Sequence, residues 1–594
     1  MRAAALGFFL VSQVVALSKG ETDNPSIFPL TASIERTEPL LVEAAASAFK
    51  LSQVTLEPTS RYGVAQQRNM EYVTSLNNTK LGCIFTSAAN LTDCSAAPSS
   101  FWQTYVKNST LPFGYSYELG YLSAADDDKP PGHMTYEACL NNCTASSTCL
   151  GITFQSPAPK PKGDVFCYMK SAIHFTPVDP SGNCPSPGKS GQPRCSPLEG
   201  EMGLGGYYGH YQGHWLSAMA FLYNNTGKAS IKTKAADFVN TLSKSQDAWG
   251  TMYPAKEGYL FPYDPIVFDV LEERTPRPLH NLYSVPFYTV HKIMAGMLDQ
   301  YTHAGNKQAL KVVLGMARWV QHNVETTLSQ GGEALWQRVL GTEWGGMNEV
   351  LFNLYDITGN PTYIKTGRYF NHWVWSAPLA AGVDDLNHNH ANTHIPEIIG
   401  NAKGYEVSGN LTDKAIALNF FDALTQNHTY ATAGSNDGEY WHMPAQLGST
   451  LNDRTEESCT QYNTLKLARH LYLWTANSTL FDFYERAILN GILGNQNHLD
   501  QAMTSFIYFL PLGGGGVTKL WGRSDFSFPC CWGTLSEQFS KLADSIFFQS
   551  ADHSTVYVNQ FVSASVDWLE QQVLPCILAK SAARRIAVGR RDLS

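Results

Sequence analysis

The sequence predicts a mainly α-helical fold in which consecutive helical hairpins form a closed ring, with β-strands near both ends of the chain. Three observations support this. Amphipathic segments over residues 201–548 end repeatedly at related turns, after which a new helix begins. Apolar and polar residues alternate with period two at 49–56 and again at 554–562. A stretch rich in Cys, Pro and Gly lies between the first strand and the helices.

Composition limits the classes of function. The chain has 594 residues, of which 12% are aromatic and 16% are charged, a balance that favours a large buried core and aromatic-lined clefts. Its net charge of -9 is dispersed, with no basic stripe, so nucleic acid is not an expected partner.

The N-terminus predicts secretion. Residues 1–18 read as a signal peptide, because Arg2 precedes an apolar run that ends at small residues. The run is too short and too interrupted for a membrane span, and no later segment qualifies. We therefore expect an extracellular protein. Eight Asn-x-Ser/Thr sequons agree with this route: Asn77, Asn90, Asn108, Asn142, Asn224, Asn410, Asn427 and Asn477.

Residues 40–110 are expected to open the catalytic unit. The alternation at 49–56 predicts one strand with a buried face, and 62–76 has helical spacing with Gln66 and Asn69 on one side.

Residues 111–200 are predicted to form a disulfide-rich insertion. The spacing Cys-x3-Cys-x5-Cys-Leu-Gly-Ile-Thr-Phe resembles PAN/apple domains, which bind proteins or glycans in the families that carry them, although a generic cystine-stapled insertion fits as well. An even set of cysteines in and around this stretch is typical of disulfides: Cys83, Cys94, Cys139, Cys143, Cys149, Cys167, Cys184 and Cys195.

Residues 201–548 are expected to form the helical ring. The hairpin turns place Gly, or once Ala, where a helix closes in the left-handed conformation, at Gly227, Gly305, Gly359, Gly409 and Ala476. An open solenoid is the alternative, but irregular intervals and long loops that carry His and Glu favour a closed ring with one functional mouth.

Residues 549–594 are expected to begin a β-sandwich that is truncated. The strand pattern at 554–562 is clear, whereas the basic tail from 567 onward is expected to fray.

Four cysteines stand apart from the disulfide stretch, and three of them suggest a metal site. Adjacent Cys530 and Cys531 follow a proline in a tight loop, and Cys459 and Glu457 bring the ligand set to the four that tetrahedral zinc takes. Cys576 is the fourth. Disulfides or inert core thiols remain the alternative, because the Cys-x-x-Cys spacing of zinc fingers is absent.

Glu439 is the candidate proton donor, since its loop is rich in aromatic residues and desolvation would keep the acid protonated. A thiolate and a protonated carboxylate form the pair that a retaining glycosidase needs, although a solvated loop acid is the simpler reading of Glu439 alone. Histidines at helix starts, beside Tyr, Trp and Asn, suggest contacts to sugar hydroxyls, or else hydrogen-bonded core residues.

Seven motifs in one order resemble the β-L-arabinofuranosidases of glycoside hydrolase family 127 and its relatives, over residues 49–90 and 200–565. They are Gly-His-Trp-Leu-Ser-Ala at 213, Pro-Phe-Tyr-Thr-Val-His-Lys at 286, Gly-Gly-Met-Asn-Glu-Val-Leu at 345, His-Ala-Asn-Thr at 390, Glu-Ser-Cys-Thr-Gln-Tyr-Asn at 457, Tyr-Glu-Arg at 484 and Cys-Cys-Trp-Gly-Thr at 530. The resemblance implies an (α/α)6 barrel with β-sandwich material, bound zinc and retaining hydrolysis through a cysteine.

By motif, Cys530 would be the nucleophile and Glu439 the acid/base, while Glu457, Cys459 and Cys531 would be the other zinc ligands. The implied sugar contacts are Gln66, His214, His291, His390, Glu485 and Tyr508. The disulfide-rich insertion departs from the family core.

The expected function is therefore that of a secreted zinc glycosidase that releases β-L-arabinofuranosyl or related units from cell-wall glycans or glycoproteins. One alternative is an inactive glycan-binding or adhesion protein. Another is a different toroid enzyme, such as a polysaccharide lyase or an unsaturated-uronyl hydrolase, whose chemistry needs neither three thiolates nor zinc.

Overall fold

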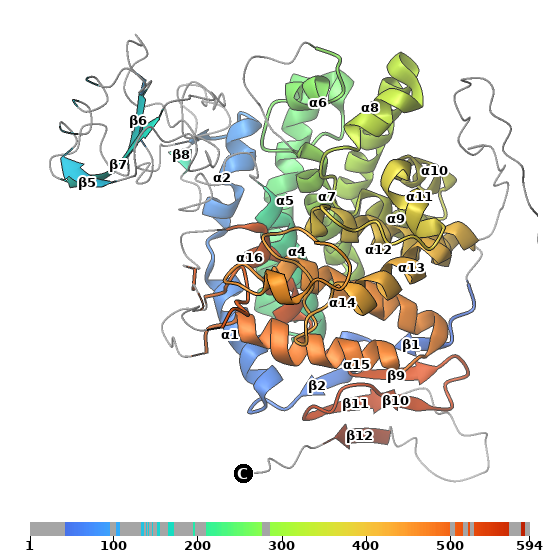
Figure 1. The fold of residues 1–594 in the computed structure, drawn as a ribbon. Coiled ribbons are helices and arrows are strands. Elements are labelled where there is room, and N and C mark those ends of the chain that lie inside the picture. The colour runs from blue at the N-terminus through green and yellow to red at the C-terminus, as the bar shows by residue number, and fades with distance from the viewer. Residues whose placement is uncertain are drawn as a thin grey trace, which may run out of the picture. The chain divides into compact units, whose positions relative to one another are not determined.

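The computed structural model of the protein describes residues 42–94, 209–275, 285–498, 505–514 and 528–568, the strands at 103–106, 132–135, 151–154, 164–170, 194–195 and 584–588, and a few single positions. Most of these residues are helical (Figure 1). The predicted signal peptide at 1–18, the tail around Cys576 and most of the insertion lie outside the described residues. No helix among those described is long and apolar enough to cross a membrane.

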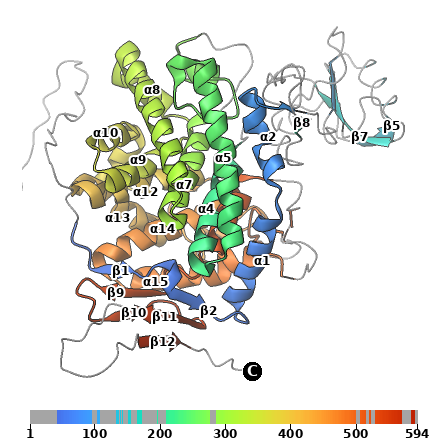
Figure 2. The ribbon, with the colours of Figure 1, turned by 180° about the vertical axis from the view of Figure 1, so that it is seen from behind.

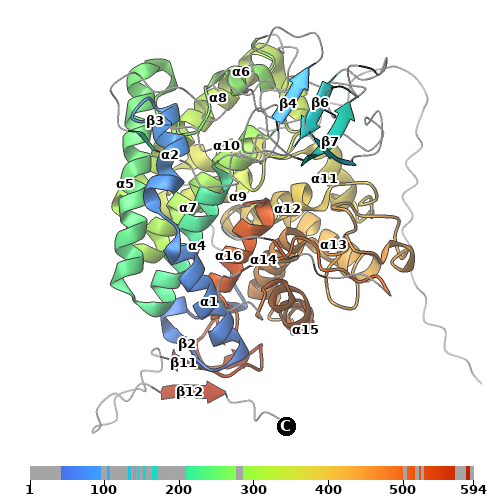
Figure 3. The ribbon, with the colours of Figure 1, turned by 90° about the vertical axis from the view of Figure 1, so that its left-hand side faces the viewer.

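Six helices pack side by side in a closed ring. In order around it, α4 contacts α7, α7 contacts α9, α9 contacts α12, α12 contacts α14, α14 contacts α16, and α16 returns to α4 (Figure 3). Every residue of α4 from His210 to Leu222 is buried, as expected for a helix enclosed on all sides. The bounds of these inner helices are α4 (His210–Thr226), α7 (Pro286–Ala304), α9 (Met347–Thr358), α12 (Ala391–Ser408), α14 (Ser458–Thr475) and α16 (Cys530–Ser540).

A second layer of helices covers the ring. Each of the first five inner helices is followed by an outer helix packed against it, and α1 lies against α16 and α4 (Figures 1 and 2). The outer bounds are α1 (Arg61–Ser75), α5 (Ala229–Met252), α8 (Lys307–Val339), α10 (Pro361–Tyr369), α13 (Leu411–Asn427) and α15 (Thr479–Arg486). This is the (α/α)6 arrangement, so the predicted fold class is confirmed. Shorter helices are α2 (Asn78–Ala88), α6 (Ile266–Leu271) and α11 (Trp373–Ala380).

The five predicted hairpin turns are confirmed. Each inner helix from α4 to α14 ends at a residue in the left-handed conformation, with φ between 49° and 70°. The residues are Gly227, Gly305, Gly359, Gly409 and Ala476. In four turns the next residue is an asparagine, at 306, 360, 410 and 477, whose side chain accepts from the first backbone N–H groups of the outer helix.

Two small antiparallel sheets join the ends of the catalytic unit. In one, β9 lies between β1 and β10, and in the other β11 lies between β2 and β12. The N-terminal strands therefore pair with C-terminal ones. The bounds are β1 (Ala46–Ala48), β2 (Val54–Leu56), β9 (Phe547–Ser550), β10 (Val556–Val558), β11 (Ala564–Trp568) and β12 (Arg584–Val588).

The strand boundaries differ from the prediction at two places. The single strand expected at 49–56 is wrong, because a 3-10 turn at Leu51–Gln53 separates β1 from β2 and the chain changes sheet there. The tail expected to fray from 567 onward instead supplies the end of β11 and all of β12, which pair over five residues. Alternate residues of β11 are buried, so this strand has an apolar face whose burial stabilises it.

The insertion contains a four-stranded antiparallel sheet in the order β4-β6-β7-β5. A parallel pair, β3 with β8, brings residues 93–94 beside 194–195. Cys83 in α2 is disulfide-bonded, as predicted for that cysteine. The likeness to PAN/apple domains stays a prediction. The bounds are β3 (Asp93–Cys94), β4 (Gln103–Val106), β5 (Gly132–Thr135), β6 (Gly151–Phe154), β7 (Asp164–Lys170) and β8 (Arg194–Cys195).

Candidate active site

The N-terminal ends of the inner helices meet at a cavity of about 250 Å³. Its walls come from the first turns of α4, α7, α12 and α16, from the loop before α9, and from two loops on either side of α14. The lining residues are His210, Tyr288, Glu343, His390, Asn392, Glu439, Tyr508, Pro529 and Cys530. The ring therefore has one end at which chemistry-bearing side chains gather.

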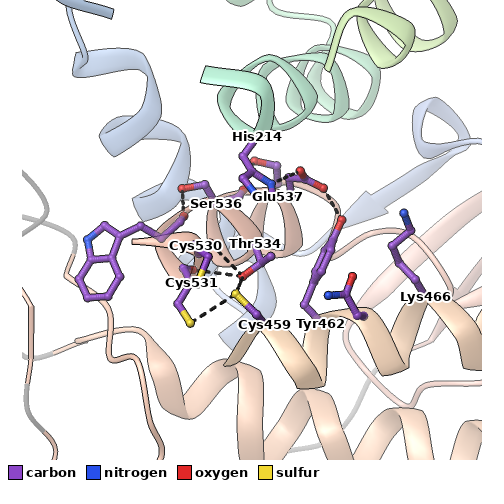
Figure 4. Close-up of polar contacts among 12 residues, drawn as sticks. His214, Cys459, Tyr462, Lys466, Cys530, Cys531, Thr534, Ser536 and Glu537 are labelled. Atoms are coloured by element: carbon purple, nitrogen blue, oxygen red, sulfur yellow. Dashed lines mark hydrogen bonds and ion pairs between the residues drawn. The ribbon is translucent and has the colours of Figure 1, made fainter. Parts of the chain in front are cut away.

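Four predicted ligands lie together beside this cavity. One ligand atom from each of Glu457, Cys459, Cys530 and Cys531 falls within 4.8 Å of all the others. The sulfurs of Cys459 and Cys531 are 3.4 Å apart (Figure 4). Glu457 Oε1 lies 3.9 Å from Cys530 Sγ and 3.8 Å from Cys531 Sγ. Ligand atoms around tetrahedral zinc are separated by about 3.8 Å when Zn–S is about 2.3 Å. The donors and their spacing thus fit a metal of this kind.

Local sequence explains how the four donors converge. Pro529 has an extended backbone (φ -65°, ψ 167°) and caps α16, so both cysteines fall in its first turn. Glu457 caps α14, and Cys459 follows in the first turn of that helix. Because α14 and α16 are neighbours in the ring, their two helix starts bring the donors together.

The surroundings of Glu457 favour a cation. Its side chain is buried, and its Oε2 accepts hydrogen bonds from Asn436 and Thr460, which leaves Oε1 facing the sulfurs. Burial raises the pKa of Glu457 well above its usual value, and Cys530 and Glu439 raise it further. A bound cation would offset this cost of burying charge.

Cys530 differs from the other two cysteines. Cys459 and Cys531 are fully buried, whereas Cys530 is partly exposed and lines the cavity. Hydrogen bonds from the Cys459 and Cys531 thiols lower the pKa of Cys530 well below its usual value, while burial raises the pKa of each of those two thiols. Cys530 is therefore the thiolate that a ligand in the cavity would meet.

Glu439 faces the same space as Cys530. The Tyr508 hydroxyl donates to Glu439 Oε1 at 2.6 Å and lies 3.3 Å from Cys530 Sγ, so one side chain contacts both groups. The backbone of Glu439 is left-handed (φ 76°), a conformation that costs a non-glycine residue about 1–2 kcal/mol. The side chain is 31% exposed, so it is less enclosed than the aromatic loop sequence suggested.

His390 completes the group around Glu439. Its Nε2 lies 3.4 Å from Glu439 Oε2, and the Ala391 N–H donates to the Glu439 carbonyl at 2.8 Å. Burial by itself lowers the pKa of His390, but its hydrogen bond to Glu439 and the nearby carboxylates Glu457 and Glu343 raise it to about 9. His390 Nδ1 accepts from the Thr393 N–H at 3.2 Å, so the ring nitrogen that can donate to Glu439 is Nε2.

Two of the six predicted sugar contacts, His390 and Tyr508, line the cavity, and four do not. Gln66 is buried and donates to the Ser540 carbonyl at 3.3 Å. Glu485 accepts from the Phe561 N–H at 3.0 Å, beside the C-terminal strands.

The other two, His214 and His291, lie behind the cavity. Nδ1 of His214 is 2.5 Å from Glu537 (Figure 4). The His214 ring also packs so closely against Gly533 that a Cβ on this glycine would lie 2.2 Å from the ring. His291 is buried against Gly345, in the loop that carries Glu343. Both support the cavity wall instead of forming it.

Four lining residues were missed as individual candidates: His210, Tyr288, Glu343 and Asn392. His210 and Tyr288 stand one turn closer to the helix start than His214 and His291, and only the first turn of an inner helix reaches the mouth. The signal for Glu343 was its place two residues before the Gly345-Gly346 pair. Burial raises the pKa of Glu343 to about 7, and its Oε1 has no hydrogen-bond partner among the described residues.

Comparisons with known proteins identify a family whose model matches the helical part of the chain. The family model described as the GH127 catalytic domain of β-L-arabinofuranosidases matches residues 189–544. Among solved structures, a GH127 β-arabinofuranosidase is 17% identical, with a TM-score of 0.46, over 60% of this chain and 55% of that one. A GH127 β-L-arabinofuranosidase from Geobacillus stearothermophilus T6 is 19% identical, with a TM-score of 0.45, over 61% and 60%.

The match thus spans somewhat more than half the length of these solved chains. A search among curated proteins finds no match. Since the family model covers more than half of the sequence, the chain belongs to the GH127 β-L-arabinofuranosidase family.

Proposed function

We propose that the protein is a zinc-dependent retaining glycosidase that hydrolyses β-L-arabinofuranosyl bonds, with Cys530 as nucleophile and Glu439 as acid/base. The observation that carries the proposal is that the Cys530 thiol and the Glu439 carboxyl face one cavity and both contact the Tyr508 hydroxyl. Membership of the GH127 family supports the substrate class.

The proposed reaction has two displacements. Glu439 gives its proton to the leaving glycosidic oxygen while the Cys530 thiolate attacks the anomeric carbon, so a C–S bond replaces the C–O bond. Glu439, now a carboxylate, takes a proton from water, and that water oxygen displaces the sulfur. The two inversions give net retention, and both residues return to their starting states.

The donor set assigns the metal a supporting role. Zinc held by Glu457, Cys459, Cys530 and Cys531 would keep the sulfurs ionised at neutral pH. Cys530 also opens α16, whose N-terminal backbone N–H groups favour a thiolate.

The other lining residues suit a small sugar. His210, Glu343, His390 and Asn392 present donors and acceptors for ring hydroxyls. A volume of about 250 Å³ accommodates one sugar ring, which favours removal of a terminal unit from a chain. We propose cell-wall glycans or glycoproteins as substrates and an extracellular location, on the strength of the apolar N-terminus and the eight sequons.

The test combines metal analysis with turnover. Full-length protein is assayed on a synthetic aryl β-L-arabinofuranoside before chelation, after chelation and after zinc is restored, with zinc content measured each time. We expect one zinc in the Cys–Glu site per active chain and loss of activity on its removal. Arabinose release with zinc fully removed would contradict the metal requirement.

The nucleophile is tested by substitution and by trapping. Cys530→Ala should lower kcat by about 10⁴-fold or more, since no other group can form the covalent intermediate. Mass spectrometry of the denatured wild-type protein, quenched during turnover, should find the sugar on the peptide that contains Cys530. A variant that keeps normal turnover would refute the assignment. Zinc-loaded protein that binds arabinosides without cleaving them would favour the glycan-binding alternative.

A further inference from the structure

A second group of potential metal ligands lies outside the cavity lining. It consists of His372, which caps α11, and His394 and Glu397, which are three residues apart in α12. One ligand atom from each of the three falls within 4.8 Å of the other two. Residues three apart share a helix face, so α12 presents its imidazole and carboxylate to the start of α11 together.

Glu397 lacks the partner that its burial requires. The residue is 3% exposed, and its Oε1 has no hydrogen-bond partner among the described residues. Burial raises the pKa of Glu397 well above its usual value, and Glu343 adds to the shift. A buried carboxyl without a counter-charge is unfavourable, whereas a cation in contact with it would remove that cost.

His394 has the tautomer that can bind a metal through Nε2. Nδ1 of His394 lies 2.8 Å from the His390 carbonyl, to which it can only donate, so the lone pair of His394 is on Nε2. A backbone carbonyl in this position is how metal-bound histidines are usually oriented. The His394 ring also packs on Trp375 of α11, with centroids 4.4 Å apart. Both histidines are half-buried, and Glu397 beside them is buried.

We propose that His372, His394 and Glu397 form a second divalent-metal site, separate from the cysteine group, that joins α11 to α12. Two imidazole nitrogens and one carboxylate oxygen favour zinc or a similar first-row transition ion over calcium or magnesium, which take oxygen ligands. Water can supply the fourth ligand. The site goes beyond the proposed hydrolytic function and does not depend on it.

The position of this site gives it a supporting role for the cavity. His394 holds the His390 carbonyl, and His390 and Asn392 both line the cavity at the start of α12. A metal that ties His394 and Glu397 to His372 would therefore fix the first turn of α12 against α11. It is a structural ion at the edge of the mouth and contacts no reacting atom.

Metal stoichiometry tests the proposal directly. Full-length protein is stripped with chelator, incubated with zinc, passed over a desalting column and analysed for zinc per chain. We expect two zinc ions in the wild type and one in Glu397→Gln, which keeps the side-chain shape, and in His372→Ala, at the less buried helix edge. The matched control is His322→Ala, an exposed histidine on α8, which should retain both ions.

Cobalt distinguishes the two sites. Thiolate ligands give intense charge-transfer absorption in the near ultraviolet, whereas a site of two imidazoles and a carboxylate gives only weak visible bands. Both variants should bind one equivalent of cobalt instead of two. Glu397→Gln should keep the thiolate absorption, whereas Cys459→Ser should lose it and keep the weak visible bands. Zinc should also raise the Tm of Cys459→Ser but not that of the double variant with His372→Ala. One zinc per wild-type chain, or unchanged binding in both Glu397→Gln and His372→Ala, would overturn the proposal.

Discussion

The two ends of the helical ring differ in how their structure depends on the sequence. At the C-terminal ends of the inner helices, five similar turns close on a left-handed residue. At the N-terminal ends, side chains from seven separate segments meet in one cavity. The first end is repetitive and local, while the second depends on residues distant in sequence.

The N-terminal segment lies against the closing turns. Asn225, near the end of α4, donates to the Leu51 and Val54 carbonyls, and the Ala45 N–H donates to the Leu473 carbonyl near the end of α14. The Val42 N–H likewise reaches the Glu406 carbonyl in α12, at 3.4 Å. These contacts anchor the sheets at the end away from the cavity, so stability and chemistry are separated along the ring. Substitutions can test this separation.

The largest effect is expected at the mouth, from Glu439→Gln. Without a proton donor, kcat on substrates with alkoxide leaving groups should fall by about 10²–10⁴-fold, and less on activated aryl glycosides that need little protonation. Thermal stability should not fall, because the side chain is partly exposed and its backbone strain remains. The control is Asp453→Asn, an exposed acid in the loop before α14. Equal losses on both substrate types would argue against an acid role.

The next largest effect is expected at the closing end, from Glu406→Gln, and it concerns stability alone. Burial raises the pKa of Glu406, but His470, Lys403 and the Trp474 indole outweigh it and lower the pKa to about 2. A depressed folded-state pKa stabilises the protein above about pH 4.5, the unfolded value, and the benefit disappears as pH falls through about 2.

The wild type should therefore exceed Glu406→Gln by up to about 3 kcal/mol at pH 7, and the gap should narrow below about pH 4.5. Denaturant unfolding at several pH values measures it. A gap that does not change with pH would show that the variant acts through packing instead.

A smaller effect is expected from Glu343→Gln, and its comparison with Glu485→Gln tests whether the cavity geometry or the family motif identifies the sugar contact. Glu343 lines the cavity, and its Oε1 has no hydrogen-bond partner in the part of the chain that the structure describes. Glu485 instead accepts from a backbone N–H beside the sheets. Glu343→Gln should lower kcat/KM by about 10–100-fold, the value of a hydrogen bond to a charged group. Glu485→Gln should lower kcat/KM less than Glu343→Gln and lower Tm more. The reverse order would favour the assignment implied by the family motif.

The smallest effects are expected at the turns. Ala476 occupies a position where the other four turns have Gly, with φ of 49°, so Ala476→Gly should stabilise the protein by about 0.5–1 kcal/mol. Gly409→Ala should destabilise it by a similar amount, because φ is 70° and a Cβ would meet no atom within 4 Å, which leaves backbone strain alone. Turnover should be unaffected in both. A change in kcat would show that the two ends are coupled.

The features that depend on adjacent residues were predicted from the sequence more successfully than those that depend on distant residues. The turns at Gly227, Gly305, Gly359, Gly409 and Ala476 were predictable because a left-handed cap is a property of a few adjacent residues. The four donors Glu457, Cys459, Cys530 and Cys531 were identified by their type and confirmed as neighbours in space. The prediction of a single strand at 49–56 was wrong, because an alternating pattern predicts an extended chain but does not reveal where the chain changes from one sheet to the other.

Of the predicted sugar contacts, His390 and Tyr508 line the cavity and His214 does not, for a related reason. His210 and His214 lie on one face of α4, and sequence periodicity treats them alike. His210 reaches the cavity, whereas His214 is held by Glu537 from α16.

The sequence by itself determined the class of fold, the places where each inner helix ends and the kinds of donor available for chemistry. Each of these depends on residue type and on neighbours within a turn or two. Only the tertiary structure decided which helix turn faces the cavity, which of three thiols is open to it, and that His372 meets Glu397. Those contacts join segments far apart in the chain, and the packing of the whole ring sets the distances between them.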